Sequence, residues 1–210
     1  WFATVPGVIT SSAAIWALYA GILRHTVFTD GVYDPATAAD LFDRAKKATD
    51  RAIALDPNLP DGYAARAGQR YLTGEWNLEG ARSDFERALA LDPNNPRYLV
   101  GKAQLLLYFS HRVDEGIAAA KRATELDPIG GGWNMLGFGY RRAGRLAEAK
   151  AAFQRADEID SANEGNVFIA EIELREGHPD KALAMVEASS RSDFEPYFVA
   201  RTLVLVAMHR

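Results

Sequence analysis

The stretch WNMLGFGYRRAGRLAEAKAAFQRADEIDS, residues 133–161, decides the fold of this 210-residue chain. Trp133, Leu136 and Tyr140 lie three and then four residues apart, so they share one face of a helix that repeats every 3.6 residues. Gly144 follows at a place where a helix can end in a left-handed cap. Apolar residues then recur three or four apart at Leu146, Ala149, Phe153, Ala156 and Ile159. The stretch therefore predicts two amphipathic helices that pack antiparallel across a short turn.

Two small residues, Gly137 and Ala149, fall where the helices would meet. Glycine inside a helix costs roughly 1 kcal/mol relative to alanine, so we expect Gly137 to serve close packing. The spacing W-x2-L-G-x2-Y, followed after eight residues by A-x3-F-x2-A, resembles the tetratricopeptide repeat. The resemblance implies an all-α fold, a right-handed superhelix (α-solenoid) of stacked antiparallel helix pairs.

A recurring corner supports this resemblance along the chain. Leu-Asp-Pro occurs at residues 55–57, 91–93 and 126–128, and a degraded copy, Ile-Asp-Ser, occurs at 159–161. Successive aspartates are 36, 35 and 33 residues apart, close to the family period of 34. Proline lacks an amide hydrogen and disfavours helix in the residue before it. Each corner is therefore predicted to end one helix and to fix the turn to the next.

These corners predict an N-terminal extension over residues 1–10 and a single tetratricopeptide-like domain over residues 11–210. The domain would consist of an irregular repeat (11–60), repeats at about 61–96, 97–129, 130–162 and 163–191, and an unpaired final helix at about 195–210. The final helix is apolar, whereas a solenoid end normally has a polar capping helix. We therefore expect either a fragment of a longer protein or an end covered by another chain, including self-association through the uncapped helix.

The first 23 residues carry no charge. A membrane-spanning helix is one interpretation, since about 20 apolar residues span a bilayer. Pro6, Gly7 and the polar run 10–12 reduce the apolar part to about a dozen residues, a length that fits a buried helix. We therefore expect no membrane span, and we predict a helix that begins at Ser11 or Ser12 and continues to Arg24.

The composition argues against several classes of function. The net charge of −4 and the lack of a basic stripe argue against a nucleic-acid partner. The chain has no cysteine, which excludes disulfides and thiolate chemistry but leaves the compartment open, with a cytoplasmic location favoured. The four histidines have no metal-ligand spacing, and the glycine run 130–132 follows no strand, so a turn is favoured there over a phosphate site. We expect no catalytic, cofactor-binding or metal-binding residues, and no enzymatic activity.

With these classes of function disfavoured, a surface that binds a partner protein is the expected functional site. In the family, the first helix of each pair lines a concave groove. The resemblance assigns to this groove the residues that lie one, five, and eight or nine positions after the tryptophan position of each repeat, which Trp133 occupies in the fourth repeat. In the second and third repeats these positions include Ala65 and Gly101. The candidate partner-binding residues among them are Gln69, Tyr108, Phe109, Asn134, Phe138, Arg141, Arg142, Glu171 and Arg175. Tyrosine, phenylalanine and arginine are favoured anchors at interfaces. The alternative is that these aromatic residues pack between adjacent repeats.

Three hypotheses for the function follow. The first is a protein-interaction module or scaffold that holds a partner peptide or domain in the groove. The second is a regulatory or sensor segment of a larger bacterial signalling protein, because the repeats with Trp76 and Asn77 in a turn look similar to those attached to cyclases, kinases and transcription regulators. The third is an enzyme whose site has no recognisable motif. A clamp for a C-terminal carboxylate is doubtful, since only Asn134 occupies a comparable position.

Overall fold

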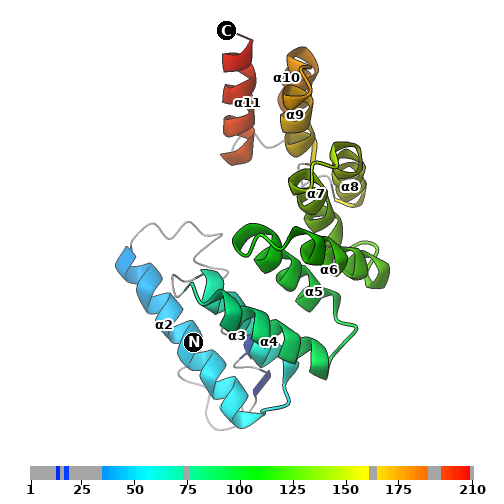
Figure 1. The fold of residues 1–210 in the computed structure, drawn as a ribbon. Coiled ribbons are helices and arrows are strands. Elements are labelled where there is room, and N and C mark those ends of the chain that lie inside the picture. The colour runs from blue at the N-terminus through cyan, green and yellow to red at the C-terminus, as the bar shows by residue number, and fades with distance from the viewer. Residues whose placement is uncertain are drawn as a thin grey trace. The chain divides into compact units, whose positions relative to one another are not determined.

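The computed structural model describes residues 13–14, 17–18, 35–72, 76–160, 165–188 and 195–208, and in these ranges the chain is helical with no strand (Figure 1). The all-α prediction is confirmed. The chain divides into two compact units, Trp1–Ser110 and His111–Arg210. The predicted extension over residues 1–10 and most of the predicted helix over 11–24 lie outside the described residues. The single domain over 11–210 stays a prediction.

The first unit is a series of helices in which each packs on the next. Residues 13, 14, 17 and 18 are helical. The following elements are α2 (Pro35–Leu55), α3 (Pro60–Leu72), α4 (Leu78–Leu91), α5 (Pro96–Gln104) and the π-helical turn η2 (Leu105–Phe109). Helix α3 also packs against α5, so the first helices of two successive repeats lie side by side.

The second unit continues the pattern with two complete hairpins (Figure 1). Its helices are α6 (Val113–Leu126), α7 (Gly132–Arg142), α8 (Leu146–Ile159), α9 (Gly165–Arg175), α10 (Pro179–Glu187) and α11 (Glu195–Ala207). Each packs on the next, and α11 also packs on α9. The predicted third repeat spans the division, with α5 and η2 in the first unit and α6 in the second. Among the described helices, none is both long and apolar enough to span a lipid bilayer.

All four predicted corners end a helix. The backbone N–H of each corner aspartate closes the last helical turn by donating to the carbonyl oxygen four residues earlier, at 3.0 Å from Asp56, 2.9 Å from Asp92, 2.8 Å from Asp127 and 3.0 Å from Asp160. The Asp56 side chain then accepts a hydrogen bond from the Asn58 backbone N–H at 2.9 Å. The corner is therefore built from local backbone and carboxylate contacts, which explains why the same tripeptide recurs.

A left-handed residue lies between the two helices of each of the four repeats from α3 to α10. Gly144 (φ 74) and Gly177 (φ 85) occupy this place in the hairpins α7–α8 and α9–α10. Two residues with side chains occupy it elsewhere, Trp76 (φ 48) before α4 and His111 (φ 53) before α6. A left-handed backbone costs a residue with a Cβ about 1–2 kcal/mol. The turns at Trp76 and His111 are therefore less favourable than the turns at Gly144 and Gly177.

The close approach predicted at Gly137 is present. A Cβ at this position would lie 2.5 Å from Cε1 of Phe153, whose ring is fully buried. Phe153 also packs against Phe138 of α7, with ring centroids 5.1 Å apart, and Phe168 of α9, with centroids 5.2 Å apart. The missing side chain of Gly137 therefore makes room for the ring that joins this hairpin to the next one.

Candidate functional site

A groove of about 550 Å³ lies between α3 and α5 in the first unit. Its floor consists of small or apolar residues of both helices, Ala64, Ala65, Val100 and Gly101, with the rings of Tyr71 and Phe85 beneath. A Cβ at Gly101 would lie 2.7 Å from Cζ of Phe85, so the floor has no room for a larger residue there. Ala65 and Gly101 are two of the positions that the family resemblance assigns to the groove.

One end of the groove is polar. Tyr98 Oη donates a hydrogen bond to Asp61 Oδ1 at 2.7 Å, and Arg97 Nη2 lies 3.4 Å from the same oxygen. Burial, and then the neighbouring carboxylate of Asp61, raises the pKa of Tyr98 well above its ordinary value. The phenol therefore remains protonated and acts as a hydrogen-bond donor. At the other end, Tyr71 Oη donates to Gln104 Oε1 at 3.3 Å.

The sequence did not single out Asp61, Arg97 or Tyr98, because these residues lie outside the repeat consensus. They occupy the first turn of α3 and of α5, just after the Leu-Asp-Pro corners. The corners already place these turns at the same end of neighbouring first helices. That placement was the available signal, since residues 61, 97 and 98 then belong to one end of one surface.

The predicted residues of the first unit lie in two different environments. Gln69 is only 5% exposed, and its Nε2 donates to Thr49 Oγ1 of α2 at 2.8 Å. Tyr108 is 36% exposed at the end of η2. Phe109 packs against Tyr71, with ring centroids 5.1 Å apart, and against Trp76, with centroids 6.0 Å apart. Gln69 thus joins two helices, whereas Tyr108 is exposed at the surface and its ring lies beside Phe109.

Three of the predicted residues in the second unit form one cluster. The Arg141 guanidinium lies 5.3 Å from the ring centroid of Phe138 and forms an ion pair with Glu171 of α9. Phe138 and Phe168 pack edge to face, with centroids 4.8 Å apart. These contacts join α7 to α9, which is the packing between adjacent repeats that the sequence left open as an alternative for the aromatic residues.

Of the remaining predicted residues of this unit, two are exposed and one is half-buried. Arg142 is exposed, and its Nη2 lies 2.8 Å from Nδ1 of His111. Arg175 is exposed at the end of α9, and Asn134 is half-buried on α7. The assignment of all nine predicted residues to a partner-binding surface stays a prediction.

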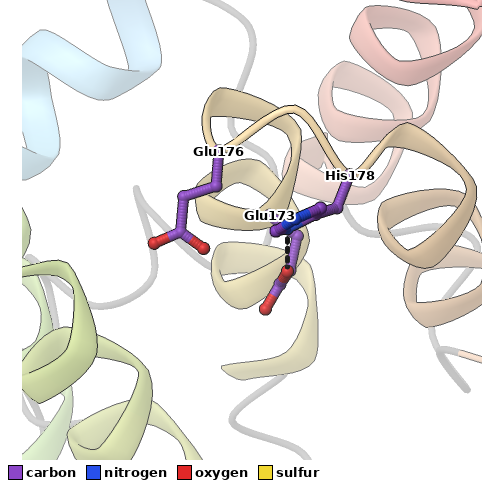
Figure 2. Close-up of side chains that lie close together, drawn as sticks. All are labelled: Glu173, Glu176 and His178. Atoms are coloured by element: carbon purple, nitrogen blue, oxygen red, sulfur yellow. Dashed lines mark hydrogen bonds and ion pairs between the residues drawn. The ribbon is translucent and has the colours of Figure 1, made fainter.

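A polar cluster that the sequence did not predict lies at the turn between α9 and α10 (Figure 2). Glu173 is 2% exposed, and it accepts hydrogen bonds from Lys150 Nζ at 2.6 Å and Lys181 Nζ at 2.8 Å. Nδ1 of His178 lies 3.0 Å from Glu173 Oε2. Lys150 also pairs with Glu176. Hydrogen bonds from Lys150, then from Lys181, lower the pKa of Glu173 to about 2.

The carboxylates of Glu173 and Glu176 and the imidazole of His178 lie close enough together to be considered as metal ligands. A metal site needs oxygen and nitrogen lone pairs directed at one point that a cation can occupy. Here the two lysine ammonium groups already lie on Glu173 Oε1. The geometry therefore supports an ion-pair network that joins α8, α9 and α10 rather than a metal centre.

Comparison with known proteins agrees with this architecture. Residues 131–163 match the tetratricopeptide repeat family model. No curated protein matches the sequence significantly. Among solved structures, PilF of Pseudomonas aeruginosa is 16% identical, with 94% of this chain and 86% of that chain covered and a TM-score of 0.72.

Two further structures have the same fold. PilW, a type IV pilus biogenesis factor, is 15% identical, with 93% of this chain and 86% of that chain covered and a TM-score of 0.74. YrrB, described as a TPR protein with an unusual peptide-binding site, is 18% identical, with 95% and 93% covered and a TM-score of 0.61. At these identities the likeness concerns the fold alone. The family match over residues 131–163 and the stacked helix pairs agree, and the fold of the chain is that of tetratricopeptide repeat proteins.

Proposed function

We propose that this protein is an interaction scaffold that binds a peptide segment of a partner protein, without catalysing a reaction. The groove between α3 and α5 carries the proposal, because first helices of successive repeats line it. Its volume of about 550 Å³ falls within the range of about 300–1,000 Å³ that is usual for ligand sites. YrrB, which shares the fold, is described as having a peptide-binding site, and this supports the same type of ligand here.

The chemistry of the groove suggests what the segment would present. Apolar side chains would lie on the floor of Ala64, Ala65 and Val100 and gain free energy from the surface removed from water. At the polar end, the Arg97 side chain is 77% exposed and is held by Asp61 only at 3.4 Å. An acidic group next to the apolar part of the segment would therefore find a partner in Arg97.

The polar groups of the groove do not favour catalysis. Asp61 and Tyr98 are hydrogen-bonded to each other, and the raised pKa of Tyr98 opposes the formation of a phenolate base or nucleophile. Within the second unit, Arg142 and Arg175 are exposed, and we propose them as partner-binding residues of that unit.

The test is affinity capture with the purified protein, followed by identification of the captured partner and measurement of its affinity for groove variants. Val100→Glu would place a charge on the apolar floor, and Ala65→Trp would fill it. The matched control is Ala90→Trp, at an exposed position of α4 that does not line the groove. We expect both groove variants to lose the partner, whereas the control retains it and all three keep the wild-type melting temperature. Undiminished capture by Val100→Glu would show that the partner binds elsewhere.

A further inference from the structure

Two arginine side chains meet one carboxylate where α3 packs against α4 (Figure 1). Arg66 of α3 donates from Nε and Nη2 to the two carboxylate oxygens of Asp84 of α4, at 2.9 and 2.7 Å. Arg70, four residues later on α3, donates from Nη1 to Asp84 Oδ2 at 2.7 Å. A carboxylate that is only 5% exposed therefore holds two guanidinium groups in place.

A third arginine joins them through Tyr63. The guanidinium carbons of Arg66 and Arg87 lie 5.4 and 5.7 Å from the centroid of the Tyr63 ring, distances at which a cation is attracted to an aromatic face. Arg87 is exposed on α4, and no carboxylate of the described residues forms an ion pair with it. We call Tyr63, Arg66, Arg70 and Arg87 the arginine cluster.

The surroundings of the arginine cluster do not balance its charge. Two carboxylates face the three guanidinium groups. Asp84 is buried between two of them, and the exposed Asp50 of α2 acts on Arg66 from a longer distance. Arg66 and Arg70 are only 28% and 25% exposed, so their charges are screened less than those of fully exposed groups. A partly buried charge without a counterion costs free energy, and one further anion would restore the balance.

The arginines also keep hydrogen-bond donors for such an anion. A guanidinium carries five N–H groups in a planar fork. Among the described contacts, Arg66 uses Nε and Nη2, and Arg70 uses Nη1. We propose that the arginine cluster binds the side-chain carboxylate of an aspartate or glutamate in a partner protein. A single carboxylate matches both the missing charge and the planar geometry of the donors.

This surface is separate from the groove between α3 and α5. The residues of α3 that line the groove are Asp61, Ala64, Ala65 and Tyr71, and none of them belongs to the arginine cluster. Residues 63, 66 and 70 are three and four positions apart, so they share a different face of α3. The inference therefore goes beyond the proposed function and does not depend on it.

The test measures the affinity of the purified full-length chain for a dye-labelled peptide of alternating glutamate and serine, by fluorescence anisotropy at low ionic strength. Arg87→Gln removes the member of the cluster that is exposed and outside the Asp84 ion pairs, so the variant should keep the wild-type melting temperature. We expect it to bind the peptide about tenfold more weakly, the effect of one lost hydrogen bond to a charged group.

The matched control is Arg82→Gln, which changes the net charge equally on the same helix. Arg82 is bonded to Glu79 and Glu86, and it lies outside the arginine cluster. This variant should retain the wild-type affinity for the glutamate peptide. A peptide with glutamine in place of glutamate should not bind either protein.

A second measurement locates the bound peptide without any substitution. The side-chain Nε–H resonances of Arg66 and Arg70 are followed by proton–nitrogen correlation NMR during a titration with the glutamate peptide. Both should shift, and neither should respond to the glutamine peptide. Unshifted resonances at saturating glutamate peptide would overturn the inference.

The remaining outcomes decide between the cluster and its alternatives. Equal weakening by Arg87→Gln and Arg82→Gln would show that net charge alone attracts the peptide, and would overturn the inference. A loss of affinity in Arg97→Gln but not in Arg87→Gln would overturn it by assigning the peptide to the polar end of the groove. Binding of a phosphoserine peptide without binding of the glutamate peptide would overturn the carboxylate as the ligand. The proposed function fails on a different result, which is capture of the partner by Val100→Glu at wild-type level.

Discussion

In the hairpin formed by α7 and α8, Tyr140 precedes the turn; in the hairpin formed by α9 and α10, Glu173 stands at the same place. The two turns have the same backbone hydrogen bonds. The Arg145 N–H donates to the Tyr140 carbonyl oxygen at 2.9 Å, and the His178 N–H donates to the Glu173 carbonyl oxygen at 2.9 Å. A left-handed glycine precedes the second helix in both.

The side chains at this place are held in opposite ways. Tyr140 packs beside the apolar cluster around Phe153, and the Arg145 guanidinium lies 4.4 Å from its ring centroid. Glu173 is surrounded instead by Lys150, Lys181 and His178. The same backbone thus accepts either an aromatic contact or an ionic network, which shows that the turn does not depend on the identity of this side chain.

The interior of the two hairpins differs in a second, compensating way. Gly137 faces the Phe153 ring, whereas Ala170 and Val186 occupy the corresponding places in the next hairpin and are both fully buried. The hairpin of α7 and α8 combines a glycine with a large ring, and the hairpin of α9 and α10 combines an alanine with a valine. Cores tolerate changes best when the total volume is conserved, so both solutions fit the same helix spacing.

The largest effect should come from removing the charge at Glu173. In Glu173→Gln the side chain keeps its size, but the ammonium groups of Lys150 and Lys181 lose their anionic partner. Hydrogen bonds to charged groups contribute about 1.5–3 kcal/mol, so we expect the free energy of unfolding to fall by about 2–3 kcal/mol in chemical denaturation at pH 7. Glu176→Gln is the control, since Glu176 pairs with Lys150 alone among these groups and should have a smaller effect.

The same variant makes a prediction about pH. The pKa of Glu173 is lowered from an ordinary value of 4.5 to about 2 in the folded protein. Its contribution to stability is therefore fully present above about pH 4.5, and it is lost as the pH falls towards 2. The difference in unfolding free energy between wild type and Glu173→Gln should narrow over this range. A difference that stayed constant from pH 7 to pH 2.5 would show that the carboxylate is not held in its charged form.

A smaller loss of stability is expected when Gly137, in the hairpin of α7 and α8, is replaced by alanine. In Gly137→Ala the new methyl group would lie 2.5 Å from the Phe153 ring. Overpacking costs about 1–3 kcal/mol, and a contact as close as 2.5 Å belongs to the upper part of this range, about 2–3 kcal/mol. The higher helix propensity of alanine offsets about 1 kcal/mol of this cost. We expect a net loss of about 1–2 kcal/mol by thermal unfolding. Gly131→Ala is the matched control, because a Cβ there would meet no atom within 4 Å; equal stability of the two variants would contradict the account of the core.

The left-handed glycine that the two hairpins share should give equal losses of stability when it is replaced by alanine. Gly144→Ala and Gly177→Ala both place a Cβ on a left-handed backbone, and nothing lies within 4 Å of either new methyl group. The cost is therefore that of the backbone conformation alone, about 1 kcal/mol in each case. Thermal unfolding of the two variants should give the same shift. Clearly different shifts would mean that the Tyr140 and Glu173 environments do influence the turn.

The smallest expected effect is a gain in stability, from a change at His111. His111 occupies the left-handed place that glycine occupies in the other two turns. His111→Gly relieves this conformation, although histidine tolerates it better than most residues and the contact with Arg142 is lost. We expect the free energy of unfolding to rise by about 0.5 kcal/mol. His111→Ala provides the comparison, since it removes the same contact without relieving the backbone and should not stabilise the protein.

The sequence predicts much of this architecture because its determinants are local. The Leu-Asp-Pro corners, Gly144 and the spacing around Trp133 each depend on residues within one or two helical turns, so the pattern can be recognised without knowing the partners. The role of Gly137 was also predictable, since a glycine inside a helix requires a reason, and its neighbour Phe153 belongs to the same repeat.

What the sequence could not show depends on contacts between repeats. Gln69 fits a groove position by spacing, but Thr49, twenty residues earlier, draws its side chain towards α2. Glu173 looks like an exposed acidic residue until Lys150 and Lys181 are placed beside it. The groove end formed by Asp61 and Tyr98 combines residues 37 positions apart. The corners place both residues at the same end of neighbouring helices, but no pattern within one repeat predicts their hydrogen bond.

The order of helix packing has a consequence for how this protein unfolds. Within each unit, the main contacts of the described helices join elements that are adjacent or one apart along the chain. Chains of this kind have low contact order and fold fast, and their stability is approximately a sum of repeat and neighbour terms. Amide hydrogen exchange should therefore be graded from one helix pair to the next, and a pulling force should extend the chain pair by pair instead of in one cooperative event.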